Sequence, residues 1–371
     1  MMDRRLIEHF DWALFFIMIT LMAIGLINLY SATYYDFRGQ RFSPYFIRQV
    51  MWVILGCLAF LAVLMIDYHH LQNYAVLIYS VGIILLILVL CIGQSSHGAQ
   101  RWLGVGSVRF QPSEVEKIIM AVAVAAWAAS DRIPLYPSFL EVAFLVLINV
   151  PVFVLIAMQP DLGTALLVCL VAGTVVFTKG IRKSWFVGGM VCLALLAYPV
   201  WEKGLKDYQR NRILAAINPD RDPQRTGYHA RQARIAIGSG MIWGRGYLKG
   251  TQNKLKFLPE KHTDFAFAVW AEEWGFMGSV VLLCLYGLFL YRCFMSIFLA
   301  KDAFGTFLCV GLTAIFMWEI LINLGMVIGI LPVVGVPLPF MSYGGSSILK
   351  AAVAVGLMES VTMRRYTFRS F

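Results

Sequence analysis

The chain has 371 residues, of which 60% are hydrophobic and 14% charged, with a formal net charge of +10. Soluble globular domains carry about a quarter charged residues, so a chain this apolar cannot present an ordinary water-facing surface. The apolar residues also gather in runs of about 20, the length that crosses roughly 30 Å of hydrocarbon. We therefore predict an all-α polytopic membrane protein and treat residues 1–371 as a single integral membrane domain.

About ten apolar runs predict about ten membrane helices. In chain order they cover residues 12–31, 47–66, 72–92, 112–130, 139–158, 162–178, 184–201, 265–291, 304–330 and 345–363. The first run lacks a clear small-residue cleavage site, so we interpret it as a membrane helix and not as a signal peptide. All seven cysteines lie in or at the ends of the runs without a CxxC pair, which argues against disulfides and a zinc site.

The distribution of Lys and Arg predicts the orientation. Ten spans place both termini on one side, where the short segments hold eleven Lys and Arg, against five in the short loops of the other side. Cytoplasmic segments carry the positive excess, so we expect both termini in the cytoplasm. The long loop 202–264, between the seventh and eighth spans, then lies outside.

This outer loop holds thirteen Lys and Arg against six Asp and Glu. Such a balance suits an anionic ligand at the membrane surface. A solvated loop with a charge bias explains the same count. Nucleic acid is excluded as a ligand because it is not present on that face.

Charged residues inside spans usually mark function, because inserting each one costs about 2.5–3.5 kcal/mol. In "RFQPSEVEKII", at the start of the fourth span, Ser113 and Glu116 fit a capping box. Glu114 and Lys117 lie three residues apart on one helix face and can pair. This pair is either structural or part of a polar cavity open to the outer face. The sequence gives no partner for the other charges within the spans: Glu272, Glu273, Glu319, Lys350 and Glu359.

Three connections between the spans contain recognisable patterns. "QPDLGT" forms a tight outer corner in which Asp161 can cap the next helix. "GYHARQARIAIGSG" predicts a short interfacial helix, and the Gly-rich stretch after it is better explained as an irregular loop than as a phosphate cradle. "GILPVVGVPLPFMSYGGSS" is too apolar for an ordinary loop and too broken for a helix. We expect it to be a re-entrant element facing the same cavity as Asp264.

"FLPEKHTDFAFAV" places Asp264 directly before the eighth span. The aspartate is either the cap of that helix or a chemical group at the boundary between water and lipid. Thr263 can supply the cap by itself, which weakens the first interpretation.

"QRWLGVGSVRFQPSE", "QPDLGTA", "FLPEKHTDFAFAV" and "GILPVVGVPLPFMSYGGSS" occur in this order and with these spacings. Together they strongly resemble the SEDS family (shape, elongation, division and sporulation) of bacterial cell-wall polymerases, from about residue 12 to residue 363. The "LPVVGVPLP" segment and the basic residue in "LPEKHTD" resemble the elongation branch more than the division branch.

The resemblance implies a peptidoglycan glycosyltransferase of the bacterial inner membrane, with its active site outside. It would polymerise lipid II during elongation and rod-shape maintenance, release undecaprenyl diphosphate, and work with a class B penicillin-binding transpeptidase and other elongation proteins. The family's essential aspartate falls on Asp264, and its paired acid and lysine fall on Glu114 and Lys117. Expected cavity or substrate-binding residues are Glu114, Lys117, Asp161, Arg101, Arg109, Lys261, His262, Thr263, Ser342 and Ser346.

The implied reaction is an inverting displacement in which a sugar hydroxyl attacks an anomeric carbon that carries a lipid diphosphate. It needs one base and positive charge for the leaving group, but no second carboxylate as acid, unlike glycoside hydrolysis. Asp264 suits the base, and Lys117 could meet the diphosphate from within the membrane. A divalent cation (Mg²⁺ or Mn²⁺) could be bound by Asp264 or Asp161. A lipid II flippase and a non-catalytic scaffold that activates the transpeptidase stay open as alternatives.

Overall fold

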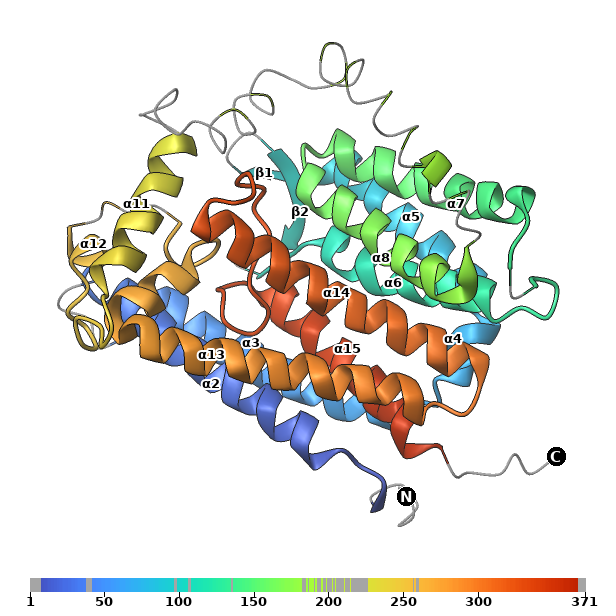
Figure 1. The fold of residues 1–371 in the computed structure, drawn as a ribbon, viewed down its shortest axis with the longest axis horizontal. Helices are drawn as coiled ribbons and strands as arrows, with labels where there is room; N and C mark the ends of the chain where they lie inside the picture. The colour runs from blue at the N-terminus through green and yellow to red at the C-terminus, as the bar shows by residue number, and fades with distance from the viewer. Residues whose placement is uncertain are drawn as a thin grey trace.

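The computed structural model describes residues 8–37, 42–96, 99–105, 108–134, 136–181, 226–255, 257 and 260–365, with scattered positions between 185 and 214. Nine of the ten predicted spans are helices (Figure 1): α2 (Trp12–Tyr34), α3 (Pro44–Leu64), α5 (Ala75–Ile92), α6 (Pro112–Ala128), α7 (Phe139–Met158), α8 (Leu162–Gly180), α13 (Ala266–Leu299), α14 (Ala303–Ile328) and α15 (Gly345–Met363). The predicted seventh span, 184–201, and the first part of the long loop lie largely outside the described residues.

Within the described ranges, eight helices are long and apolar enough to cross a membrane. Helix α6, with 17 residues, is shorter than the other spans and carries buried charged residues. The prediction of a polytopic, mainly helical membrane protein is confirmed.

The predicted end of the eighth span is wrong. Helix α13 continues past residue 291 and Arg292 and ends at Leu299. The guanidinium of Arg292 instead pairs with the carboxylate of Asp11, with Nε at 3.0 Å and Nη2 at 2.5 Å from Oδ2. A paired charge is tolerated near the end of a membrane helix, so the helix extends by about two turns.

Helices α14, α15 and α6 form the centre of the bundle. Nearly all of α15 is buried, and it packs against α3, α13, α14 and α6. Helices α5 and α7 bury only 22% of the residues in their most apolar stretches, as expected of lipid-facing helices. The polar side chains of the central helices therefore face one another instead of lipid.

The loop between α5 and α6 contains a small antiparallel sheet that was not predicted. Its strands are β1 (Gln94–Ser96), β2 (Ala99–Val105) and β3 (Val108–Phe110), in the order β1-β2-β3, with Leu103 opposite Phe110. Two further helices, α11 (Thr226–Ser239) and α12 (Thr251–Lys254), follow in the second part of the long loop. The predicted helix α11 buries its alanines against α13 and α14. A five-residue helix, α4 (His69–Asn73), joins α3 to α5.

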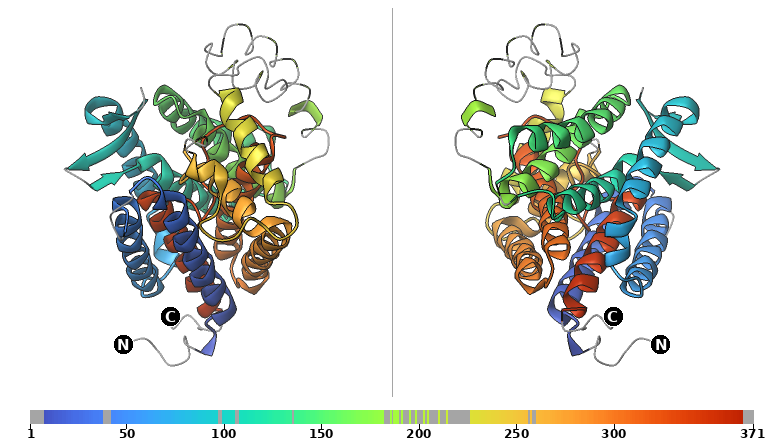
Figure 2. Two further views of the ribbon diagram at one scale, coloured as in Figure 1. Left: turned by 90° about the vertical axis from the view of Figure 1, so that its left-hand side faces the viewer. Right: turned by 90° about the vertical axis from the view of Figure 1, so that its right-hand side faces the viewer.

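Both chain ends lie at the same end of the bundle, opposite α11, α12 and the sheet (Figure 2). His9 Nδ1 lies 3.4 Å from Nη2 of Arg365, so the start and the end of the described chain are neighbours. This arrangement agrees with an even number of spans.

We expect the end with both termini to face the cytoplasm. In a variant with the exposed Cys91 replaced by serine, a cysteine at Leu255 should react with an impermeant maleimide in intact spheroplasts. A cysteine at Asp131, in the turn between α6 and α7, should react only after the membrane is opened. If only position 131 were labelled in intact cells, the orientation of the protein in the membrane would be opposite to the one we expect.

Candidate functional site

The backbone around Asp264 is held by a buried amide of α14. Nδ2 of Asn323 donates hydrogen bonds to the carbonyl oxygens of Asp264, at 3.1 Å, and Val336, at 2.8 Å. One side chain therefore joins the start of α13 to the irregular segment 331–344. The carboxylate of Asp264, which is half-buried, lies beside Gly335, where an added Cβ would stand 3.6 Å from Oδ2.

Neither Thr263 nor Asp264 caps α13. The N-cap is Phe265, which makes no side-chain cap hydrogen bond. The hydroxyl of Thr263 is used elsewhere, at 3.3 Å from the carbonyl of Glu260 and 3.1 Å from its carboxylate. The expectation that Thr263 supplies the cap is wrong, because the chain turns back on Glu260 before the helix starts. The cap explanation for Asp264 is wrong as well.

The predicted irregular element is present as the non-helical segment 331–344, and it packs against the residues before α13. Ser342, which is buried, donates from Oγ to the carbonyl of Thr263 at 2.6 Å and accepts from the N–H of Leu338 at 2.9 Å. From α3, Gln49 donates to the carbonyl of Ser342 at 3.1 Å and accepts from the N–H of Gly344 at 3.2 Å. These bonds satisfy backbone that would otherwise be costly to bury.

Positive side chains gather at the end of this segment. Arg48 and Arg109 lie near Tyr343, and their charges oppose the upward shift that burial imposes on the pKa of the Tyr343 phenol. Arg48 was not among the predicted site residues. In the sequence it is a single arginine at the start of a span, and nothing there connects it to Tyr343. Lys261 is buried and pairs with Asp36 at 2.8 Å.

His262 lies between aromatic rings. Its ring centroid is 4.9 Å from that of Tyr45 and 5.9 Å from that of Tyr343. Burial lowers the pKa of His262, although the nearby charge of Glu260 opposes this shift. The backbone carbonyl of His262 accepts a 2.8 Å hydrogen bond from the N–H of Tyr343.

Asp161 caps α8, as predicted, by accepting the N–H of Thr164 at 3.3 Å. Its second oxygen accepts from Nε2 of Gln111 at 3.2 Å, and Nη1 of Arg101 in β2 lies 3.8 Å from the first. The N–H of Gln111 in turn donates to Oγ of Ser346 at 2.9 Å. These contacts link the sheet, the "QPDLGT" corner and the starts of α6 and α15.

The described residues do not form a metal site that includes Asp161. Both of its carboxylate oxygens are occupied by a helix N–H, an amide and a guanidinium. Nowhere in the ranges given above do three His, Cys, Asp or Glu side chains gather as a ligand set. Asp264 by itself would supply a single ligand, so we derive no step through a metal ion.

Two lysines and two glutamates form a buried charge cluster between α6, α14 and α15. Nζ of Lys117 lies 2.6 Å from Oε1 of Glu114 and 2.7 Å from Oε1 of Glu319. Nζ of Lys350 lies 2.5 Å from the same oxygen of Glu319 and 3.1 Å from Oε2 of Glu114. The predicted pairing of Glu114 with Lys117 is present, and the structure supplies two partners that the sequence could not identify. The four charges sum to zero, and none of the four side chains is more than 5% exposed.

The predicted capping box at the start of α6 is wrong. Pro112 takes the first helical position, Gln111 is the N-cap, and no side chain caps the helix. Ser113 therefore lies inside the first turn, and Glu116 is buried against α5 instead. A Cβ added at Gly82 would lie 2.4 Å from Oε2 of Glu116, so the glycine makes room for this carboxyl group.

The charge cluster lies one helical turn below the polar groups around Asp264 and Asp161. Glu319 precedes Asn323 by four residues on α14, and Lys350 follows Ser346 by four on α15. Four residues of α-helix span about 6 Å. The charge cluster therefore lies directly beneath the residues that hold Asp264, and we call it the floor of the site.

The Gly-rich stretch is a loop packed on a break in α13, as predicted in preference to a phosphate cradle. Gly275 has φ +65°, and the N–H groups of Arg245 and Gly246 donate to the carbonyls of Glu272 and Glu273, which the break leaves without partners in the helix, each at 3.0 Å. A Cβ at Gly244 would lie 2.1 Å from the Glu273 carbonyl. The backbone of this loop therefore approaches the backbone of α13 too closely for a side chain, which explains why glycine occupies these positions. The Glu272 carboxylate accepts N–H groups at the start of α12, which gives it a structural role.

The fold and the site define a class: a multispan helical membrane protein with a carboxylate at one mouth of the bundle and a neutral charge cluster beneath it. The chain belongs to the cell cycle protein family of FtsW, RodA and SpoVE, whose model matches residues 11–367.

Similar proteins include one from Escherichia coli K12 named peptidoglycan glycosyltransferase MrdB, 39% identical over 96% of this chain and 94% of that protein. A solved chain from work titled "Structural coordination of polymerization and crosslinking by a peptidoglycan synthase complex" has a TM-score of 0.83, with 33% identity over 97% of this chain and 99% of that one. The rod shape determining protein RodA of Thermus thermophilus has a TM-score of 0.72, with 30% identity over 97% of this chain and 98% of its own.

The position of Asn323 makes it a test of how firmly Asp264 must be held. Asn323→Ala should lower activity together with stability, because it leaves the carbonyls of Asp264 and Val336 without a buried donor, a loss of about 1–3 kcal/mol per group. The control is Asn149→Ala, which removes a buried amide that bonds only its own helix at Leu145. Equal polymerisation rates in the two variants would show that this support is not needed.

Proposed function

We propose that the chain is a peptidoglycan glycosyltransferase that polymerises lipid II at the outer face of the bacterial inner membrane during elongation. The observation that carries the proposal is the placement of Asp264. Its carboxylate does not cap α13, its backbone is fixed by Asn323, and basic side chains lie around the adjoining segment. Names of similar proteins, MrdB above all, support the same activity.

In the proposed reaction, a sugar hydroxyl of one substrate attacks the anomeric carbon of another. The new carbon–oxygen bond forms as the bond to the lipid diphosphate breaks, and the diphosphate leaves with the electron pair. Asp264 takes the proton of the attacking hydroxyl as general base. A single displacement of this kind inverts the configuration at the anomeric carbon.

Positive charge is needed where the diphosphate departs, because the leaving group carries the developing charge. Arg48 and Arg109 lie at Tyr343, next to the segment that faces Asp264, and are the described cations best placed for this role. Lys117 is enclosed by Glu114 and Glu319, so we propose a supporting role for it within the floor instead of direct contact with the diphosphate.

We further propose that the chain works with a class B penicillin-binding transpeptidase. The solved chain titled as part of a peptidoglycan synthase complex, with polymerisation coordinated to crosslinking, supports this partner. Polymerisation should rise when the transpeptidase is co-purified, and should persist when its active-site serine is blocked.

The deciding experiment uses purified protein and labelled lipid II, with and without the partner, scored for glycan chains on a gel. Long chains that depend on this protein support the proposal. Their absence with a well-folded protein and an active partner would contradict it. Repeating the assay with chelator and with added Mg²⁺ or Mn²⁺ tests whether a divalent cation assists at Asp264.

A further inference from the structure

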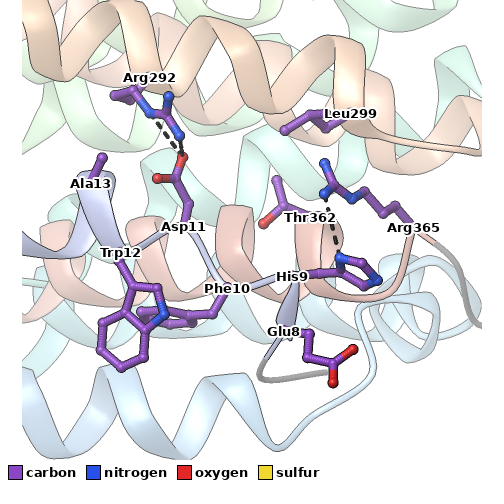
Figure 3. Close-up of a pocket in the computed structure, with 10 residues that line it drawn as sticks. All are labelled: Glu8, His9, Phe10, Asp11, Trp12, Ala13, Arg292, Leu299, Thr362 and Arg365. Atoms are coloured by element: carbon purple, nitrogen blue, oxygen red, sulfur yellow. Dashed lines mark hydrogen bonds and ion pairs between the residues drawn. The ribbon is translucent and has the colours of Figure 1, made fainter. Parts of the chain in front are cut away.

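A pocket lies at the opposite end of the bundle from Asp264, beside both termini (Figure 3). Its volume is about 300 Å³, which is at the lower end of the roughly 300–1,000 Å³ typical of small-molecule sites. The start of α2 and the last turns of α13 and α15 form its walls. The residues that matter for its chemistry are Glu8, His9, Asp11, Arg292, Thr362 and Arg365.

The charges in this pocket are mixed and separated in space. Arg292 is committed to Asp11, as the paired dashed lines in Figure 3 show. Beyond that pair, Arg365 lies against the ring of His9, with Nη2 3.4 Å from Nδ1, and the exposed carboxylate of Glu8 lies on the other side of His9. One part of the pocket therefore attracts a phosphate, and another attracts a cation.

A buried carboxyl group lies behind the pocket wall. The hydroxyl of Thr362 donates to Oε2 of the fully buried Glu359 at 3.2 Å, and the same oxygen accepts the N–H of Asp11. The other oxygen of Glu359 has no hydrogen-bond partner among the residues described. The carboxylates of Glu8 and Asp11 balance Arg292 and Arg365, so the charges that line the pocket do not favour a purely anionic ligand.

The surface of the helix bundle next to the pocket is apolar and rich in aromatic side chains. Trp12 and Phe16 on α2 are 54% and 58% exposed, and Phe298 on α13 is 68% exposed. Tryptophan is enriched where membrane helices meet the headgroup layer. A lipid whose headgroup entered the pocket would lay its acyl chains along these rings.

We propose that this pocket binds the headgroup of an amine-bearing, zwitterionic phospholipid, with its phosphate at Arg365 and His9 and its ammonium at Glu8. Basic pockets between membrane helices are known to bind lipid headgroups, and here the added carboxylate selects the amine. Because Asp11 already joins α2 to Arg292 of α13 and Glu359 of α15, a bound headgroup would hold three helix ends together.

The test measures thermal stabilisation of the delipidated, purified full chain by added lipid. Phosphatidylethanolamine should raise the melting temperature more than phosphatidylglycerol at equal concentration, since a ligand that binds only the folded state stabilises it. Arg365→Gln should weaken the apparent affinity for phosphatidylethanolamine about tenfold, as expected for a lost charge-assisted hydrogen bond. Glu8→Gln should abolish the preference for the amine, and it should fold normally because Glu8 is exposed.

The matched control is Arg132→Gln, which removes an exposed arginine from the same end of the bundle but outside the pocket. It should respond to both lipids as the unmodified protein does. Stronger stabilisation by phosphatidylglycerol, an unchanged preference in Glu8→Gln, or an equal loss in Arg132→Gln would overturn the proposal. Equal stabilisation by inorganic phosphate alone would overturn it as well, because the site would then take a soluble anion.

Discussion

Asp264→Asn should reduce lipid II polymerisation by about 10²–10⁴-fold, the usual effect of losing a general acid–base group. The asparagine keeps the size of the side chain but cannot take a proton at neutral pH. Folding should be nearly unaffected, because the cap of α13 does not involve this side chain and the contact with Asn323 uses the Asp264 backbone. The measurement is glycan synthesis by the purified variant, together with its melting temperature.

Asp131→Asn is the control for this experiment, since it changes an exposed carboxylate in the turn after α6, away from the site. It should polymerise at the unmodified rate. Normal polymerisation by a well-folded Asp264→Asn protein would end the catalytic assignment. The flippase and scaffold hypotheses would then move ahead, because a scaffold does not need the Asp264 carboxylate.

The positions of the membrane spans could be predicted because a run of about 20 apolar residues has the length and composition of a membrane-spanning helix. Errors arose where a charged residue found a partner far away in the sequence. Arg292 ended the predicted eighth span, but Asp11 pairs with it, and the helix continues. Only the folded bundle brings these two residues together.

The same limit applies to the candidate site. Local spacing predicted the contact of Glu114 with Lys117, because residues three apart share a helix face. Glu319 and Lys350 belong to helices whose relative rotation is fixed by packing, so their partners could not be predicted from one sequence. Asn323 was missed for a similar reason, since a single asparagine within an apolar run gives no sign of what it binds.

Asp161 caps α8 as predicted, but two other cap assignments failed. Thr263 fits the composition of an N-cap, yet its hydroxyl bonds Glu260. Ser113 fits a capping box, yet α6 starts at Pro112, so its N-cap is Gln111, two residues before Ser113. In both cases the composition is right, but the position of the first helical turn depends on the preceding chain.

The second large effect is expected in the charge cluster. Lys350→Met should destabilise the protein by about 3–5 kcal/mol, because it leaves two buried carboxylates facing one ammonium group. Folded proteins are stable by only about 5–15 kcal/mol, so the melting temperature should fall steeply. Polymerisation should fall with it, since the cluster supports the helices that carry Asn323 and Ser346.

Adding Glu319→Gln to Lys350→Met restores the balance of one lysine against one glutamate, Lys117 with Glu114. We expect the double variant to recover most of the lost stability, and with it most of the polymerisation. Glu319→Gln alone should be destabilising, because it leaves an excess of positive charge in the same buried place. If stability returned in the double variant while polymerisation stayed lost, the cluster would act on the substrate directly. A lysine of the floor would then have to reach the diphosphate, as the sequence first suggested for Lys117.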